Sequence, residues 1–232
     1  MPALAWSERL GRRAAGVRWQ NRAMPLPWAH LPRASLAPLP TPLTRLPRFG
    51  AAIGAEVWMK RDDVGELGLA GNKVRKLEFV LGAARAEGAD VVVIVGAEQS
   101  NAARAAAAAC ARLGLRCVLV LSGAEPERPA GNLLLDRLFG ADVRFAGTTD
   151  WDALEQAAED VRAELRADGA TPYALPVGAS SPLGAVGFAA AWSELVGQLD
   201  ELGVDASTVI HASSSGGTHA GLLAGRALTG RG

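Results

Sequence analysis

The order of apolar and polar positions along the chain predicts an α/β fold. Residues 91–95 form an uninterrupted aliphatic run, VVVIV, which is typical of a strand buried on both faces of a sheet. Residues 72–87 instead place apolar side chains at helical spacing, with Asn72 as the expected N-cap. Patterns of these two kinds alternate from about residue 56 onward. We therefore expect parallel sheets joined by right-handed helical crossovers.

The expected elements follow from this alternation. The proline-rich segment 39–47 is expected to be an extended entry. Strands are expected at residues 56–60, 91–95, 116–121, 142–145, 173–175 and 208–212. Helices are expected at residues 72–87, 101–113, 131–139, 151–167 and 184–198, and a last helix is expected to begin near His219.

Residues 1–36 differ from the rest of the chain. They are rich in arginine, poor in acidic residues, and show no sustained period. They also lack the continuous apolar core of a secretory signal peptide. We expect a flexible N-terminal extension, with a transit peptide or a start at Met24 as the alternatives.

Composition excludes several classes of function. The 24 basic residues balance the 24 acidic ones, whereas nucleic-acid and membrane-surface binders need a basic excess. The apolar runs are too short to span a bilayer. Cys110 and Cys117 both lie in apolar segments, which favours small core residues over a disulfide or a metal site. We expect a cytoplasmic protein without a metal ion.

Lysine is scarce and clustered. Arginine supplies almost all of the positive charge, while the three lysines, Lys60, Lys73 and Lys76, lie close together in the sequence. Lysine can lose its proton and form a Schiff base, and arginine can do neither. The cluster therefore indicates amine chemistry, although three residues could also cluster by chance.

Ligands of open α/β sheets bind beyond the carboxyl ends of the strands. Four loops qualify by position and by their content of Gly, Ser, Asn and Thr: residues 68–73, 96–101, 177–181 and 213–218.

The last of these loops continues into the clearest anion-binding segment. Residues 213–221 read SSSGGTHAG, follow an expected strand and open a helix. The glycines would let backbone N–H groups approach a phosphate, and Ser215 and Thr218 could donate from their hydroxyls. The segment is neither a Walker A loop nor GxGxxG. A glycine-rich turn with a serine cap is the structural alternative, and His219 is expected to start the helix rather than act as a base.

Two other loops carry candidate chemistry. Residues 96–101, GAEQSN, would suit a carboxylate, held by N–H groups of the first helical turn and by the Ser100 hydroxyl. Ordinary capping by Ser100 or Asn101 is the alternative. Lys73 stands in the first turn of its helix, where the positive end of the helix dipole should lower the pKa of the amine. A solvated lysine at a helix end is the alternative there.

These loops, in this order, resemble one family. GNKVRKLEF at residues 71–79 looks like the cofactor-lysine motif of the 1-aminocyclopropane-1-carboxylate deaminase/D-cysteine desulfhydrase family of pyridoxal-phosphate (PLP) enzymes. PTPL at 40–43, QSN at 99–101, PVGASSPLGAVGF at 176–188 and SGGTHAGL at 215–222 match the same family in register. The resemblance implies the two-domain, fold-type-II architecture of tryptophan synthase β. It implies a large cofactor domain of residues 37–77 and 187–232, a small domain of residues 78–186, and a homodimer.

The resemblance also implies roles for individual residues. Lys73 would be the Schiff-base lysine and the base at the substrate Cα. Asn101 would donate to the 3-oxygen of the pyridine ring. Lys76 and the loop Ser215, Gly216, Gly217 and Thr218 would hold the phosphate, and Ser100, Asn101 and Ala102 would bind the substrate. The implied reaction is β-elimination from a small amino acid, which for D-cysteine gives sulfide, pyruvate and ammonia.

Two features depart from the family pattern. Ala102 stands where family members commonly carry a larger polar residue, often histidine. The chain also stops at Gly232, before the part that normally completes the large domain and supplies the tyrosines associated with cyclopropane opening. Tyr173 does not align with those tyrosines, so we expect D-cysteine desulfhydrase-like chemistry rather than cyclopropane deamination. The alternatives are a truncated homologue that binds PLP or a partner without turnover, and a nucleotide-binding module that uses residues 213–221 for phosphate.

Overall fold

A four-stranded parallel sheet organises one half of the molecule. The computed structural model describes residues 26–65, 67–69 and 71–231, so most of the predicted extension lies outside the described residues. The sheet contains β3 (Val91–Gly96), β4 (Arg116–Leu121), β5 (Asp142–Phe145) and β6 (Pro172–Leu175), in the order β5-β4-β3-β6. All neighbouring strands in it run parallel. The predicted α/β architecture with a parallel sheet is confirmed.

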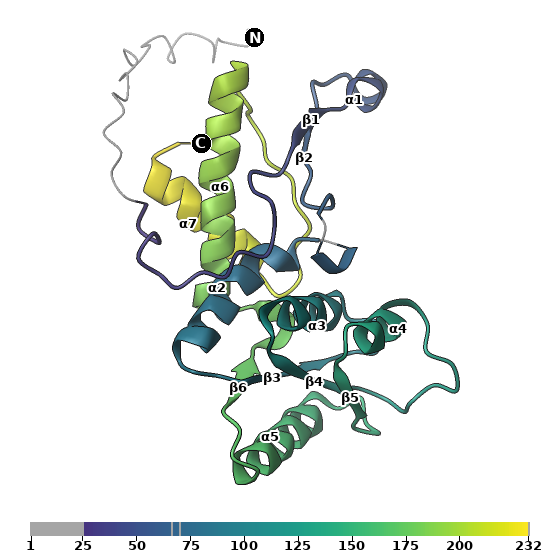
Figure 1. Cartoon of the computed structure of the whole chain (residues 1–232). Coiled ribbons are helices and arrows are strands. Elements are labelled where there is room, and N and C mark those ends of the chain that lie inside the picture. Colours follow the sequence, from purple (N-terminus) through teal and green to yellow (C-terminus); the bar gives the residue numbers. More distant parts are fainter. Residues whose placement is uncertain (1–25, 66, 70, 232) are drawn as a thin grey trace, which may run out of the picture.

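Helices cover both faces of this sheet, which explains the continuous apolar run in β3. Helices α3 (Asn101–Leu113) and α4 (Gly131–Leu138) lie on one face, and α5 (Trp151–Ala167) lies on the other (Figure 1). Val92 and Ile94 belong to the core beneath α3, whereas the residues between and beside them pack toward α5. Successive strand side chains point to opposite faces, so a strand covered on both sides must be apolar at every position.

Three helices and a hairpin form the other half of the molecule. Helix α2 (Lys73–Ala86) lies between the sheet layer and α6 (Pro182–Leu202), and α7 (Gly217–Thr229) packs along α6 (Figure 1). Trp192 Nε1 of α6 donates to Thr229 Oγ1 of α7 at 3.0 Å. The hairpin consists of β1 (Leu43–Arg45) and β2 (Trp58–Lys60), with α1 (Pro47–Ile53) between them. The hairpin strands pair antiparallel, an arrangement that the strand-and-helix pattern did not predict.

A largely buried network of charges joins the hairpin to α2 and α6. Arg75 of α2 donates to Asp62 at 2.8 Å and to Glu194 of α6 at 2.9 Å. Lys60 of β2 forms an ion pair with Glu194 and donates to the carbonyl of Thr41. Each of these charges has an opposite partner, which buried ions need. The network therefore fixes the position of α2, the helix that carries the other two lysines.

Part of the predicted extension is packed against the same helix. Within residues 26–36, Trp28 and Leu36 are buried. The Glu78 carboxylate of α2 accepts hydrogen bonds from the Leu36 N–H at 3.1 Å and from Arg33 Nε at 2.8 Å. These contacts attach residues 28–36 to α2.

Most expected boundaries agree with the structure within a few residues, but two expectations were wrong. Asn72 stands before α2 without a side-chain capping bond, because its own backbone is already helical (φ −58°, ψ −18°). Residues 208–212 form no strand. In the described part of the chain no strand pairs with them, and Ile210 is 91 % exposed. None of the described helices is long and apolar enough to cross a membrane.

Candidate functional site

Two lysine amines lie one helical turn apart at the start of α2. Lys73 is the first residue of the helix and is half-buried, whereas Lys76 is only 1 % exposed. Burial lowers the pKa of the Lys73 amine. Burial also lowers the pKa of Lys76, and the nearby charge of Lys73 lowers it further. Neither amine pairs with a carboxylate in the part of the chain that the structure describes. Two close amines without an acidic partner favour the binding of an anion.

The start of α7 lies directly beside these amines. A Cβ atom placed on Gly217 would lie 3.0 Å from Lys76 Nζ and 2.5 Å from Ser180 Oγ. A Cβ atom on Gly178 would lie 4.0 Å from Lys73 Cε and 3.9 Å from Ser215 Oγ. The predicted loops 68–73, 177–181 and 213–218 therefore converge, and only glycine leaves room at position 217.

This convergence fits a phosphate group. The first turn of α7 leaves backbone N–H groups without intrahelical partners at the positive end of the helix dipole. Gly216 is the N-cap, and Thr218 follows Gly217 in the first turn. Ser215 Oγ and Ser180 Oγ form a hydrogen bond of 3.0 Å beside the turn. Together with the two amines, these donors make the environment that a phosphate requires.

Ser180 was not among the predicted site residues. It comes from the loop 177–181, where the structure holds Ala179 fully buried in the left-handed region at φ +52°. This conformation is unfavourable for an alanine and turns the chain sharply just before Ser180. The sequence signal for Ser180 is its position inside the PVGASSPLGAVGF motif of residues 176–188.

The turn at residues 99–101 caps α3 and makes no hydrogen bond to the two lysines among the described residues. Ser100 Oγ accepts hydrogen bonds from the N–H groups of Ala102 and Ala103, both at 3.2 Å, so Ser100 caps α3 as the structural alternative predicted. Asn101 is exposed and Ala102 is buried. No hydrogen bond joins this turn to Lys73 or Lys76 in the described part of the chain. The substrate contacts of Ser100, Asn101 and Ala102 stay a prediction.

His219 is exposed in the first turn of α7. Its Nδ1 atom is 3.0 Å from Nε2 of His211, and the two rings stack at 5.2 Å between centroids. His219 is the third residue of α7, as expected for a residue near the start of that helix.

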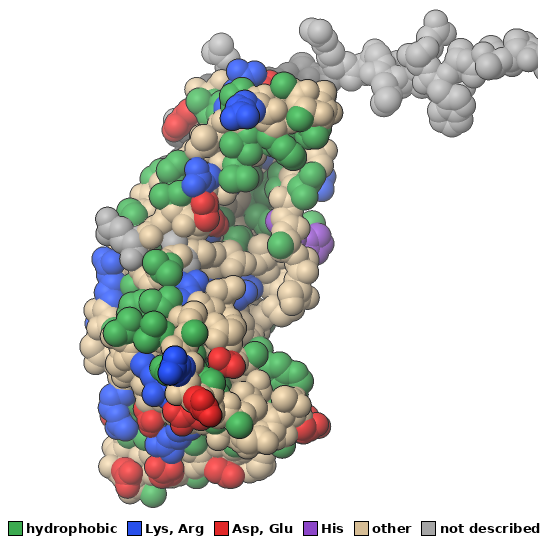
Figure 2. Space-filling view, turned by 90° about the vertical axis from the view of Figure 1, so that its right-hand side faces the viewer, with side chains coloured by type: hydrophobic (Ala, Val, Ile, Leu, Met, Phe, Trp, Pro, Cys, Tyr) green, Lys and Arg blue, Asp and Glu red, His purple; other side chains and the backbone are tan. Residues whose placement is uncertain are grey.

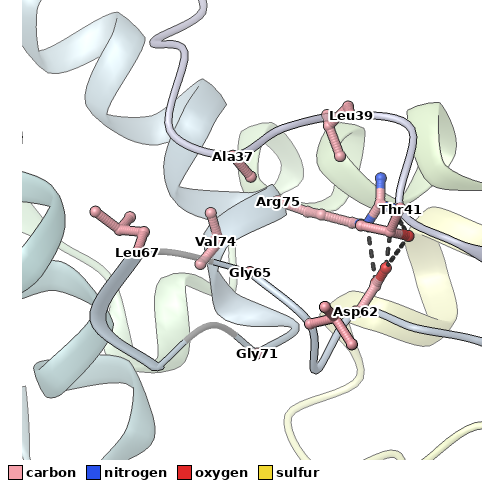
Figure 3. A pocket seen from close by; sticks show the side chains of 10 residues that line it. Ala37, Leu39, Thr41, Asp62, Gly65, Leu67, Gly71, Val74 and Arg75 are labelled. Atoms are coloured by element: carbon pink, nitrogen blue, oxygen red, sulfur yellow. Dashed lines mark hydrogen bonds and ion pairs between the residues drawn. The ribbon is translucent and has the colours of Figure 1, made fainter.

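A small cavity beside α2 is lined by none of Lys73, Lys76, Ser180 and residues 215–218. It has a volume of about 20 Å³ and is lined by ten residues from 37 to 75, including Leu39, Leu67 and Val74. Figure 3 shows Arg75 and Thr41 directed toward Asp62 along one side of it. The cavity has room for about one water molecule, which is far too little for a cofactor.

Comparisons with known proteins agree with the geometry. A family model described as "Pyridoxal-phosphate dependent enzyme" matches residues 34–231. A protein of Pyrococcus abyssi named "Putative 1-aminocyclopropane-1-carboxylate deaminase" is 44 % identical over 201 residues, which cover 86 % of this chain and 60 % of that protein. The D-cysteine desulfhydrase of Salmonella typhi is 44 % identical over 209 residues, with coverage of 86 % and 62 %.

Solved structures give the same result. The crystal structure of an ACC deaminase homologue matches with a TM-score of 0.79 and 40 % identity, over 88 % of this chain and 61 % of that one. The crystal structure of a threonine deaminase matches with a TM-score of 0.65 and 26 % identity, over 82 % of this chain and 56 % of that one. The chain spans about three fifths of the length of the curated relatives that it matches.

Proposed function

The chain belongs to the family of pyridoxal-phosphate dependent enzymes, and we propose that it binds PLP between the start of α2 and the start of α7. The observation that carries this proposal is the placement of two amines, neither of which has an acidic partner among the described residues: Lys76 lies beside Gly217, and Lys73 lies beside Gly178. In the predicted division into a large domain (37–77 and 187–232) and a small domain (78–186), Lys73, Lys76 and residues 215–218 belong to the large domain, whereas Asn101 and Ser180 belong to the small one. That division remains a proposal.

Each residue of the site has a proposed task. Lys73 would hold the cofactor through Nζ and would take the proton from the substrate Cα, roles that a lysine amine with a pKa lowered by burial suits. Lys76 neutralises the phosphate, while Ser215, Gly216, Gly217 and Thr218 supply N–H and hydroxyl donors. Ser180 joins them. Asn101 donates to the ring 3-oxygen, and the turn at residues 100–102 receives the substrate carboxylate.

The proposed reaction is β-elimination from a small amino acid. Bound PLP acts as an electron sink that makes the substrate Cα–H acidic. After Lys73 removes that proton, a leaving group on Cβ departs. For D-cysteine, one molecule of water is consumed and sulfide, pyruvate and ammonia are formed. The relative named D-cysteine desulfhydrase supports this choice of substrate.

A second candidate is a protein that binds PLP or a partner without turnover. The two candidates share the cofactor site and differ only in the release of product.

Absorbance and product assays test both candidates. The purified chain incubated with PLP should turn yellow, with a visible band of roughly 410 nm that borohydride removes. Lys73→Ala should stay colourless. Lys60→Arg is the matched control, since it removes another lysine amine from outside the site while keeping its charge. A colourless wild-type chain refutes cofactor binding, and a yellow chain that releases neither pyruvate nor sulfide from D-cysteine favours the second candidate.

The homodimer and the cytoplasmic location also remain proposals. Figure 2 shows hydrophobic side chains gathered over the upper part of one face, where the hairpin with α1 lies. Phe49, Ile53 and Met59 of this hairpin are each about half exposed (44–55 %). We propose that a second copy covers them. Light scattering should then give the mass of a dimer for the wild type and that of a monomer for Phe49→Ser/Ile53→Ser.

A further inference from the structure

Four hydrogen bonds tie the start of α4 to the turn at residues 99–101. Asn132 Nδ2 donates to the carbonyl of Gln99 at 2.7 Å and to Oδ1 of Asn101 at 3.1 Å. The Asn132 backbone N–H donates to Gln99 Oε1 at 2.9 Å, and Gln99 Nε2 donates to the carbonyl of Ala130 at 3.1 Å. This turn is therefore held by a helix that begins some thirty residues later in the chain.

The chemistry of these partners fixes which way the Asn101 amide faces. A backbone carbonyl only accepts, so the atom of Asn132 that faces Gln99 must be the amide nitrogen. The atom of Asn101 that faces the same nitrogen must then be its oxygen. Arg104 Nη2, which only donates, also lies 3.4 Å from this oxygen. Both neighbours are donors, so the oxygen of Asn101 is directed at them.

The nitrogen of Asn101 is left on the opposite side of the amide. It makes no hydrogen bond to any residue in the described part of the chain. Asn101 therefore offers two N–H donors and no acceptor to a ligand at this turn.

The contact between Gln99 and the start of α4 requires a residue without a side chain at position 131. Its φ angle is +57°, and a Cβ atom there would lie 2.4 Å from Gln99 Oε1. A side chain at position 131 would displace Gln99 and break the bond to the Asn132 N–H.

We propose that Asn132 is a positioning residue of the cofactor site, which holds Asn101 so that its N–H groups face the bound ring. This rests on the proposed function, in which Asn101 donates to the 3-oxygen of PLP. A phenolate oxygen requires a donor, and an amide turned by half a rotation would present an oxygen and repel it. Asn132 thus acts on the cofactor through Asn101 without touching it.

Two substitutions at one position test the proposal. Asn132→Asp keeps the shape of the side chain but cannot donate, so Asn101 should turn its nitrogen toward residue 132 and its oxygen toward the ring. Asn132→Ala only removes the hold on Asn101. We expect the Kd for PLP, measured by absorbance titration, to rise at least about tenfold in the Asp variant and less in the Ala variant. The visible band of bound PLP should also move to shorter wavelength in the Asp variant.

Gln156→Glu is the matched control, because it makes the same amide-to-carboxylate change on the exposed face of α5 and should leave the Kd unchanged. Urea unfolding without PLP measures any structural damage in all three variants. Wild-type affinity in both variants at position 132 overturns the proposal, and so do equal losses of affinity that follow the loss of stability. A wild-type chain that takes up no PLP refutes the proposed function itself, and this inference with it.

Discussion

A buried carboxylate in α4 makes the stability of the protein depend on pH in an unusual direction. Asp136 is fully buried, and neither of its carboxylate oxygens has a hydrogen-bond partner among the described residues. Burial raises the pKa of Asp136 from 3.8 to about 7, against the opposing attraction of Arg104. Because one pKa unit corresponds to about 1.4 kcal/mol, this change corresponds to about 4 kcal/mol.

The direction in which the free energy of unfolding changes with pH follows from the number of protons that each state binds. Between about pH 4 and pH 7 the folded chain keeps the Asp136 proton and the unfolded chain releases it. The free energy of unfolding therefore falls as the pH rises through this window and levels off above it. The substitution Asp136→Asn introduces a side chain of nearly the same shape that does not titrate. Relative to the wild type, the variant should gain about 2–4 kcal/mol of stability between about pH 4.5 and pH 7.5.

Urea unfolding followed by circular dichroism, repeated across this range, measures the effect. The attraction between Arg104 and the ionised carboxylate is already part of the pKa of Asp136, and any pH-independent effect of the substitution shifts the whole curve of the variant, so only the change of the difference with pH is informative. Asp168→Asn, on the exposed end of α5, controls for the removal of a negative charge. Stability curves of wild type and Asp136→Asn that run parallel from pH 4.5 to 7.5 would refute the reasoning.

Three further predictions concern the site and its support. Gly217→Val should weaken PLP binding at least about tenfold, because its Cβ would lie 2.5 Å from Ser180 Oγ; unchanged affinity by absorbance titration would remove this loop from the site. Because burial lowers the pKa of Lys73, the rate of PLP uptake by the protein should reach its plateau at a lower pH than the rate at which PLP reacts with free lysine. Coincident pH–rate profiles for the two reactions would contradict this. Glu194→Gln should cost about 3 kcal/mol in urea unfolding, because Lys60 and Arg75 lose a largely buried ionic partner and Arg75 keeps only Asp62; a cost below about 1 kcal/mol would mean that the network does not hold α2.

The regular part of the fold was accessible from the sequence because its signals are local. The run VVVIV could be assigned to a doubly covered strand without knowledge of its neighbours. Helix α3 and strand β4 begin and end where their apolar patterns predict. Residues 208–212 have a suitable apolar pattern for a strand, but a strand also needs a partner, and none of the described strands pairs with them.

The site residues also differ in whether a local sequence signal predicts them. Lys73 could be proposed from its own surroundings, since a lysine in the first turn of a helix is expected to have a lowered pKa, although in the structure it is burial that lowers it. Ser180 and Asn132 could not, because each acquires its role from a residue more than thirty positions away: Ser180 from Ser215, and Asn132 from Asn101. Both stand where segments far apart in the sequence meet, and nothing in their immediate sequence tells them from ordinary polar loop residues. The Asn101 amide is held in its orientation by Asn132 of α4. No local sequence motif connects this helix with Lys73.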